Sequence, residues 1–229
     1  MMVLLASLDS LLMFARDLYL EGDPYRAILE YKRVLYTLRI EGRDTDTLYS
    51  YVLRRMLEAY VALGDPMGGM RALEYWATDH TGRDYRRYLG TLMFLMRDYG
   101  QARRVWRGDD TLEAVAGAML GDGKAYDLLG RPPGLKSPAV AAALSALIPG
   151  LGKAYAGRWK DGLYSFAINS SLALGLYLAA RDDSKPRMAV YGLAFAYFYL
   201  GNIYGSYVAV RKMNERITLE YVSRWLPLF

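Results

Sequence analysis

Residues 137–162 read S-P-A-V-A-A-A-L-S-A-L-I-P-G-L-G-K-A-Y-A-G-R-W-K-D-G, and they open the most apolar part of the chain. Three uncharged runs lie in this part, separated by short connectors: Ser137–Gly152, Gly162–Ala180 and Met188–Val210. The second and third runs are long enough to cross a hydrocarbon core of about 30 Å as helices. The first run is marginal for that length and is interrupted at Pro149-Gly150. We therefore expect a membrane module over residues 137–216.

Only seven residues, R-D-D-S-K-P-R, join the second and third runs, so the two helices are expected to form an antiparallel hairpin. Helices in lipid associate by close backbone approach, and small residues four apart mark such contacts. The expected contact brings Gly175 of the second run near Gly192 of the third. Gly201 and Gly205 lie about half a turn from Gly192. We expect them to pack against Pro138–Ile148 or a second copy of the protein.

Two asparagines interrupt these apolar runs. An unpaired amide in lipid costs about a few kcal/mol, so each side chain is expected to find a partner. The partner is either a hydrogen bond that fixes helix register or a ligand at a polar site between the helices. The Pro-Gly break is expected to bend the backbone at membrane depth. The candidate packing or polar-site residues are Pro149, Gly150, Gly152, Tyr155, Gly157, Asn169, Gly175, Gly201, Asn202 and Gly205.

The N-terminal half has a different pattern. Residues 8–41 contain two helical runs around Gly22-Asp23, with the 34-residue spacing of a tetratricopeptide repeat. Looser copies fit 50–83 and 83–116, a short pair fits 111–129, and at least three such units bury a continuous core. The expected fold class is all-α, with a tetratricopeptide-like array before a transmembrane hairpin that follows a short or re-entrant apolar helix. The expected boundaries are a repeat domain at 1–130, a linker at 131–136, the membrane module at 137–216 and an amphipathic tail at 217–229.

Composition limits the chemistry. The chain has no cysteine and one histidine, His80, which excludes disulfides, thiolate metal sites and histidine clusters. The Gly-Lys pairs at 123–124 and 152–153 lack the upstream glycine and the following hydroxyl residue of a phosphate loop. We therefore expect no enzyme activity, no metal and no cofactor.

Positive charge is concentrated in residues 83–107, which contain seven arginines and only two aspartates. The resulting net charge of +5 equals that of the whole chain. The candidate binding residues are Arg83, Arg86, Arg87, Arg103, Arg104 and Arg107. They could form a solvated face, meet anionic headgroups or bind an acidic protein. Interleaved Tyr and Trp side chains raise nucleic acid as a further alternative, although we expect a lipid or protein partner instead.

Two C-terminal motifs, P-G-L-G-K-A-Y-A-G-R-W-K-D-G and Y-L-G-N-I-Y-G-S-Y-V-A-V-R-K-M-N, resemble those of bacterial tetratricopeptide proteins with a P-G-x-G-x-x-Y-x-G membrane module. The first repeat, G-D-P-Y-R-A-I-L-E-Y-K-R, is similar to the N-terminal repeat of the same family. Lys153 stands where relatives usually carry Gln. Members are sometimes labelled with the membrane-protein-insertion factor YidD, although no YidD pattern is present. The resemblance implies a bacterial inner-membrane protein, with the side of the repeat domain left open.

The expected function is a non-enzymatic, membrane-anchored scaffold that binds an unidentified protein partner, in membrane-protein or envelope assembly. The alternative is a small membrane protein that handles a lipid, ion or small molecule at residues 149–152 and between its helices. Self-association through Gly201 and Gly205 is a further expectation. The N-terminus, M-M-V-L-L-A-S-L-D-S, lacks the basic segment of a signal peptide, and the sequence leaves open whether one is missing.

Overall fold

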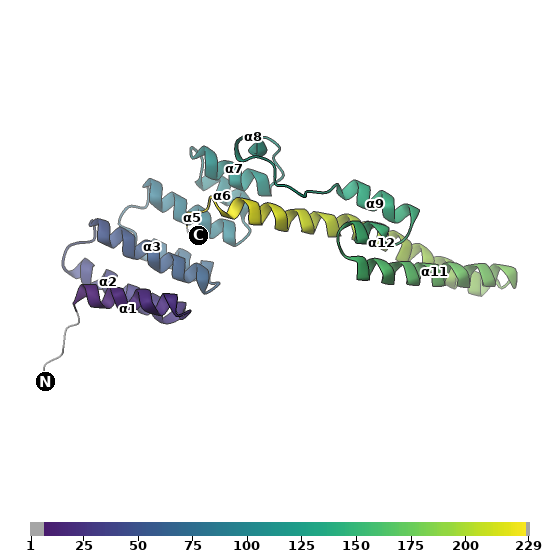
Figure 1. Cartoon of the computed structure of the whole chain (residues 1–229), viewed down its shortest axis with the longest axis horizontal. Helices are drawn as coiled ribbons and strands as arrows, with labels where there is room; N and C mark the ends of the chain where they lie inside the picture. Colours follow the sequence, from purple (N-terminus) through teal and green to yellow (C-terminus); the bar gives the residue numbers. More distant parts are fainter. Residues whose placement is uncertain (1–6, 228–229) are drawn as a thin grey trace. The chain divides into compact units, whose positions relative to one another are not determined.

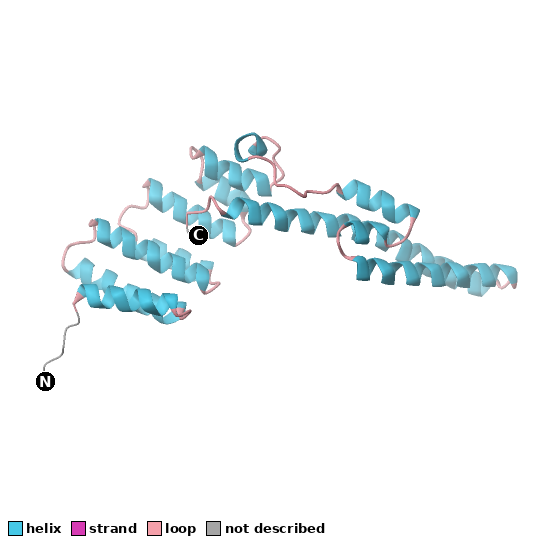
Figure 2. Ribbon diagram, in the orientation of Figure 1, coloured by secondary structure: helices cyan, strands magenta, loops and turns pink. Residues whose placement is uncertain are grey.

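The computed structural model describes residues 7–227, so residues 1–6 and residues 228–229 at the end of the expected tail lie outside it. Within residues 7–227 the chain forms twelve helices and no strand (Figures 1 and 2). The all-α class is therefore confirmed. Contacts divide the chain into two units. The first ends at Arg131 and also includes the residues from Val222 onward, and the second is Pro132–Tyr221.

The first unit is a succession of helical hairpins in which each helix packs mainly on the next one along the chain. This nearest-neighbour pattern is typical of repeat arrays, whose core is built between adjacent elements. Its helices are α1 (Leu8–Leu20), α2 (Pro24–Ile40), α3 (Thr47–Ala62), α4 (Pro66–Trp76), α5 (Arg83–Leu95), α6 (Tyr99–Val105), α7 (Asp110–Met119) and α8 (Ala125–Leu129).

The turns inside the first three hairpins share one backbone conformation. Gly22 and Gly64 have φ of 84° and 75°, and each is followed by an aspartate that caps the next helix. The third turn has Arg97 at φ 64°, followed by Asp98 as the cap. Only glycine adopts this left-handed conformation without a steric cost, so Arg97 is the unusual member. The same turn, a residue of positive φ followed by a capping aspartate, therefore recurs in all three hairpins.

Small and aromatic residues fill the first hairpin. Ala15 and Ala27 are fully buried, and Tyr31 is 1% exposed. One continuous hydrophobic cluster then extends from α1 through the following helices to Leu92 of α5. Gly90 meets the Trp106 ring so closely that an added Cβ would lie 2.2 Å from the indole Nε1. The small positions thus set how closely neighbouring helices approach.

The second unit begins with two short helices that a sharp turn separates. Its helices are α9 (Pro138–Leu147), α10 (Leu151–Tyr155), α11 (Trp159–Arg181) and all but the last two residues of α12 (Lys185–Ser223). The chain turns between α9 and α10 at Gly150, where φ is 91°. A Cβ at Gly150 would lie 2.0 Å from the Gly162 carbonyl oxygen, and one at Gly152 would lie 2.0 Å from that of Ala141. The glycines are therefore required for α10 to lie against α9 and α11.

The linker and the tail differ from the expected segments. The end of the linker is held in the second unit, because Asn214 accepts a 3.0 Å bond from the Lys136 backbone N–H and donates a 2.7 Å bond to its carbonyl. The tail from residue 217 is no separate helix, because α12 continues without interruption to Ser223. Val222, near the end of α12, and Leu226, beyond it, are buried.

Among residues 7–227, only α11 is both long and apolar enough to cross a membrane. Only 17% of its most apolar stretch is buried in the structure. The other expected span, Met188–Val210, lies in α12 but is less apolar, since tyrosines, glycines and Asn202 interrupt it. Of the two expected spans, α11 alone meets the composition of a membrane-crossing helix.

Candidate functional site

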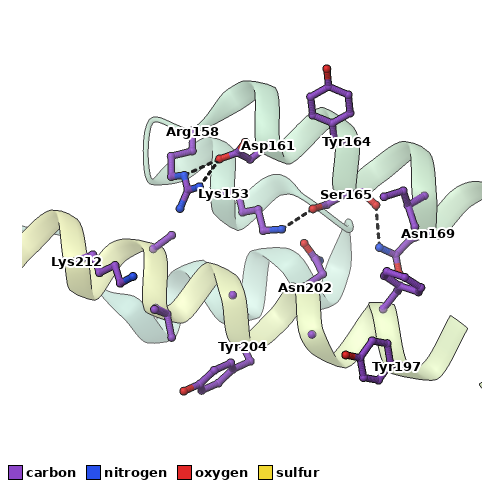
Figure 3. A pocket seen from close by; sticks show the side chains of 16 residues that line it. Lys153, Arg158, Asp161, Tyr164, Ser165, Asn169, Tyr197, Asn202, Tyr204 and Lys212 are labelled. Atoms are coloured by element: carbon purple, nitrogen blue, oxygen red, sulfur yellow. Dashed lines mark hydrogen bonds and ion pairs between the residues drawn. The ribbon is translucent and has the colours of Figure 1, made fainter. Parts of the chain in front are cut away.

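A groove of about 630 Å³ lies between α10, α11 and α12 in the second unit (Figure 3). We call it the Lys153 groove. It is lined by Lys153, Arg158, Asp161, Tyr164, Ser165, Ile168, Asn169, Tyr197, Phe198, Gly201, Asn202, Tyr204, Gly205, Val208, Ala209 and Lys212. The lining combines charged groups, aromatic rings, aliphatic side chains and two amides, which suits an amphiphilic ligand better than a purely polar one.

Three helices supply the polar centre of the groove. From α10, the Lys153 ammonium donates a 2.6 Å hydrogen bond to Ser165 Oγ of α11. One turn along α11, Asn169 Nδ2 donates a 2.8 Å bond to the Ser165 carbonyl. From α12, Asn202 Nδ2 makes a long 3.5 Å contact with the carbonyl of Ser145. Figure 3 shows Lys153, Ser165 and Asn202 side by side at this centre.

The amides are only half satisfied. Asn169 and Asn202 are 2% and 3% exposed, and the Oδ1 atom of each is buried without a hydrogen-bond partner among residues 7–227. The expectation that each asparagine finds a partner therefore holds for the nitrogens and fails for the oxygens. A buried acceptor without a donor costs about 1–3 kcal/mol. Both oxygens belong to groove-lining residues, so a ligand with hydrogen-bond donors could satisfy them if the amide side chains turn toward it.

The groove carries excess positive charge. Arg158 is paired with Asp161, whose carboxylate accepts a 2.6 Å bond from the Arg158 Nε. Lys153 and Lys212 form no ion pair within the described residues. Bringing an anion to the Lys153 ammonium would favour its charged form.

A serine network under the groove was not anticipated from the sequence. Ser145 Oγ lies 2.7 Å from Ser206 Oγ and accepts a 2.9 Å bond from the Gly152 N–H. Ser206 Oγ also hydrogen-bonds the Asn202 carbonyl at 2.9 Å. Both serines are fully buried. The available signal was the same as for the asparagines, namely a polar residue inside an uncharged run.

The small residues of α12 are placed differently from the expectation. Ser206 and Ala209 of α12 contact α9. A Cβ added at Gly201 would meet nothing within 4 Å, and one added at Gly205 would lie 3.6 Å from Cε of Lys153. Gly201 and Gly205 thus line the groove instead of receiving Pro138–Ile148. Successive residues of a helix point about 100° apart, so a shift of one residue in the expected contact places a different face of α12 against α9.

The remaining residues of the module have structural contacts. Gly175 lies against the ring of Tyr191, where an added Cβ would be 2.5 Å from a ring carbon. The Tyr155 carbonyl accepts a 2.7 Å bond from the Lys136 ammonium, which also lies over the Tyr155 ring. Gly157 has φ of 80° at the turn before α11. Pro149 is partly buried at the α9–α10 turn. None of these four lines the Lys153 groove.

The expected arginine cluster divides into two groups. One group, Arg83, Arg86, Arg87 and Arg107, lines a groove of about 320 Å³ with Asp109, which we call the arginine groove. Arg87 Nε lies 3.0 Å from the Asp109 carboxylate, and Arg83 lies 3.8 Å from it.

The other group lies outside this groove. Arg103 pairs with Asp122 at 2.8 Å and with Glu113 at 3.6 Å. Arg104 is exposed on α6 and does not line the arginine groove. The structure therefore gathers four of the six candidate arginines at one place.

Comparison with protein-family models, curated proteins and solved structures finds no match to this chain. Within the part of the chain that the structure describes, no group of three or more His, Asp or Glu side chains is arranged to hold a metal ion.

Proposed function

We propose that the protein is a membrane-anchored scaffold, in which the second unit lies in lipid and the helical hairpins of the first unit bind a protein. The observation that carries the proposal is that α11 is uncharged over Gly162–Ala180 and yet largely exposed. A long apolar helix in a water-soluble protein is normally buried in its core, whereas an exposed one marks a lipid or protein contact. The exposed side chains include Leu163, Phe166, Ile168, Leu174 and Tyr177.

The adjacent helix supports the same location. Met188–Val210 of α12 is also uncharged and exposes Leu193 at 75% and Leu200 at 65%. Its tyrosines suit a membrane, because their rings are favoured at the boundary between lipid and water. We propose that α11 and α12 form a transmembrane hairpin beside a re-entrant α9–α10 pair. We also propose that the P-G-x-G-x-x-Y-x-G motif reflects kinship with the bacterial inner-membrane family that it resembles.

The arginine groove is the proposed docking place for the partner. Arg86 and Arg107 are exposed there and form no ion pair within the described residues. Arginine clusters with few acidic neighbours recognise acidic or phosphorylated segments by bidentate hydrogen bonds. We therefore propose a protein with an acidic segment as the partner. The tetratricopeptide-like hairpins position the groove.

The test uses the full chain in its own cells, with a photo-crosslinking residue in place of Val105, which lines the arginine groove. We expect a protein crosslink that disappears when Arg86→Glu and Arg107→Glu are combined. Arg16→Glu with Lys124→Glu, an equal change of charge elsewhere in the first unit, should leave the crosslink intact. A crosslink that survives the groove substitutions, or that is lost after nuclease treatment, would contradict a protein partner at this site.

A further inference from the structure

We propose that the Lys153 groove binds an anionic glycerophospholipid whose headgroup carries hydroxyl groups, as in phosphatidylglycerol. The inference rests on the proposed membrane location of the second unit, and it adds a specific ligand that the scaffold function does not require. It is based on three properties of the groove: the position of its charges, its apolar wall and its unpartnered amide oxygens.

The charges of the groove lie near the ends of the apolar runs. Arg158 and Asp161 directly precede the uncharged run of α11, and Lys212 follows that of α12. Lys153 extends from α10 toward the centre. Because the lining has three cationic side chains and one carboxylate, a ligand phosphate would find an electrostatic complement there. A zwitterionic headgroup would leave this excess charge uncompensated.

The other end of the groove is apolar. Ile168 and Phe198 are 44% and 45% exposed, and each lies farther along its uncharged run than the charged residues of the lining. Charged residues at one end and exposed apolar residues at the other match the two parts of a lipid. A free phosphate would satisfy the charges and leave the apolar end uncovered. The combination therefore favours a lipid over a free anion.

The amide oxygens specify the headgroup further. Asn169 Oδ1 and Asn202 Oδ1 are buried acceptors that find no donor in the described part of the chain, and both residues line the groove with Lys153 and Ser165. A ligand that satisfies them must bring hydrogen-bond donors as well as a negative charge. A phosphoglycerol headgroup supplies both, since the phosphate can accept from Lys153 while the glycerol hydroxyls donate to the amides. Phosphatidylmethanol has the same charge and no hydroxyl, which makes it the matched probe.

The experiment measures lipid adducts of the full-length protein by native mass spectrometry after purification in detergent. Phosphatidylglycerol, phosphatidylmethanol and phosphatidylcholine of equal chain length are added in turn, with inorganic phosphate as a separate arm. We expect phosphatidylglycerol to bind at least about tenfold more tightly than phosphatidylcholine, the factor given by one hydrogen bond to a charged group. Phosphatidylmethanol should fall between them.

Two substitutions separate the contributions of charge and hydrogen bonding. Lys153→Met should remove the preference for both anionic lipids, whereas Lys160→Met, a nearby lysine outside the groove, should leave it unchanged. Asn202→Ala should remove only the preference of phosphatidylglycerol over phosphatidylmethanol. Circular dichroism checks that each variant is folded. If Lys153→Met does not fold, the exposed Lys212→Met serves in its place and should weaken both anionic lipids.

Equal binding of the three lipids, or a preference that Lys153→Met leaves intact, would overturn the inference. Binding of inorganic phosphate without lipid selectivity would assign the groove to a free anion and also overturn it. A dimer that persists when lipid is added and that Gly205→Leu dissociates would show a second copy of the protein in the groove. That outcome would also overturn the inference. If the protein proves soluble and monomeric without detergent, the proposed membrane function fails, whereas a detergent-dependent protein without lipid preference refutes only this inference.

Discussion

At the scale of single residues, close backbone approach decides which positions tolerate change. A Cβ at Gly152 would lie 2.0 Å from the Ala141 carbonyl oxygen and 2.6 Å from Ser145 Oγ, and the first of these is backbone that cannot rotate away. Gly201 lies in the helical interior of α12 with nothing within 4 Å of its Cβ position. The two glycines therefore have opposite roles despite similar surroundings in the sequence.

Gly152→Ala is expected to destabilise the second unit by about 2–3 kcal/mol, the upper part of the range for overpacking, because α9 and α10 must move apart. Gly201→Ala should be neutral or stabilise by up to about 1 kcal/mol, since alanine is the better helix former. Thermal unfolding in detergent measures both. Equal melting temperatures for the two variants would show that the α9–α10 contact is looser than described.

Asp122 gives a prediction about pH. The backbone N–H of Lys124 and the guanidinium of Arg103 hydrogen-bond its carboxylate at 3.1 and 2.8 Å, and they lower its pKa below the ordinary value. A carboxylate with a depressed folded pKa stabilises the protein above its unfolded pKa. That contribution is lost as the pH falls through the folded pKa.

The unfolding free energy of the native protein should therefore exceed that of Asp122→Asn by a constant amount above about pH 5, where the unfolded carboxylate is ionised. The difference should shrink as the pH falls below about 4. Chemical denaturation across this range measures it, with the exposed Asp127→Asn as control. A difference between native and Asp122→Asn that grows toward acid pH would contradict the assignment.

At the scale of elements, the Gly-Asp turns explain why helix starts were readable in the sequence. Asp65 accepts a 2.8 Å bond from the Gly68 N–H and is followed by Pro66 in the first turn of α4. These are local signals, since a cap and its donor are three residues apart. The second hairpin was nevertheless expected to begin at residue 50, and α3 begins at Thr47. Its cap, Asp46, makes no capping hydrogen bond and so gives a weaker signal.

The capping difference predicts a difference in stability. Asp65→Ala should destabilise the first unit by about 1 kcal/mol, because the partly buried side chain that caps α4 is lost and the Gly68 N–H is left without an acceptor. Asp46→Ala removes only an exposed ion pair with Arg43 and should cost less than about 0.5 kcal/mol. Urea unfolding of the two variants provides the comparison. A larger loss for Asp46→Ala would contradict the observed cap geometry.

At the scale of the whole molecule, the contrast between the two units is the main feature. In the first unit, large side chains such as Trp106 and Leu92 are buried between successive helices. In the second unit, α11 leaves Leu174 58% exposed in the middle of an uncharged run. Burying apolar surface is the dominant favourable term in folding, so an exposed run of this length supports the proposed contact with lipid.

Leu174→Arg tests the membrane location. In lipid, an arginine near the middle of a helix costs about 3 kcal/mol on insertion scales, so we expect a clear decrease in the fraction that resists carbonate extraction. Leu63→Arg, at an exposed position after α3, should leave that fraction unchanged. If the membrane-bound fraction is the same for Leu174→Arg and the native protein, α11 does not cross the bilayer.

The sequence alone determined the helical class, the turns at Gly22 and Gly64, and the apolar runs, because these depend on residues within one or two turns of each other. It also singled out Asn169 and Asn202 as unusual. Tertiary structure decided which oxygens remain without donors and which arginines share a groove. It also decided that Gly201 and Gly205 face this groove instead of α9. These outcomes depend on helix rotation and on contacts between residues far apart in the chain, and spacing within one helix does not encode them.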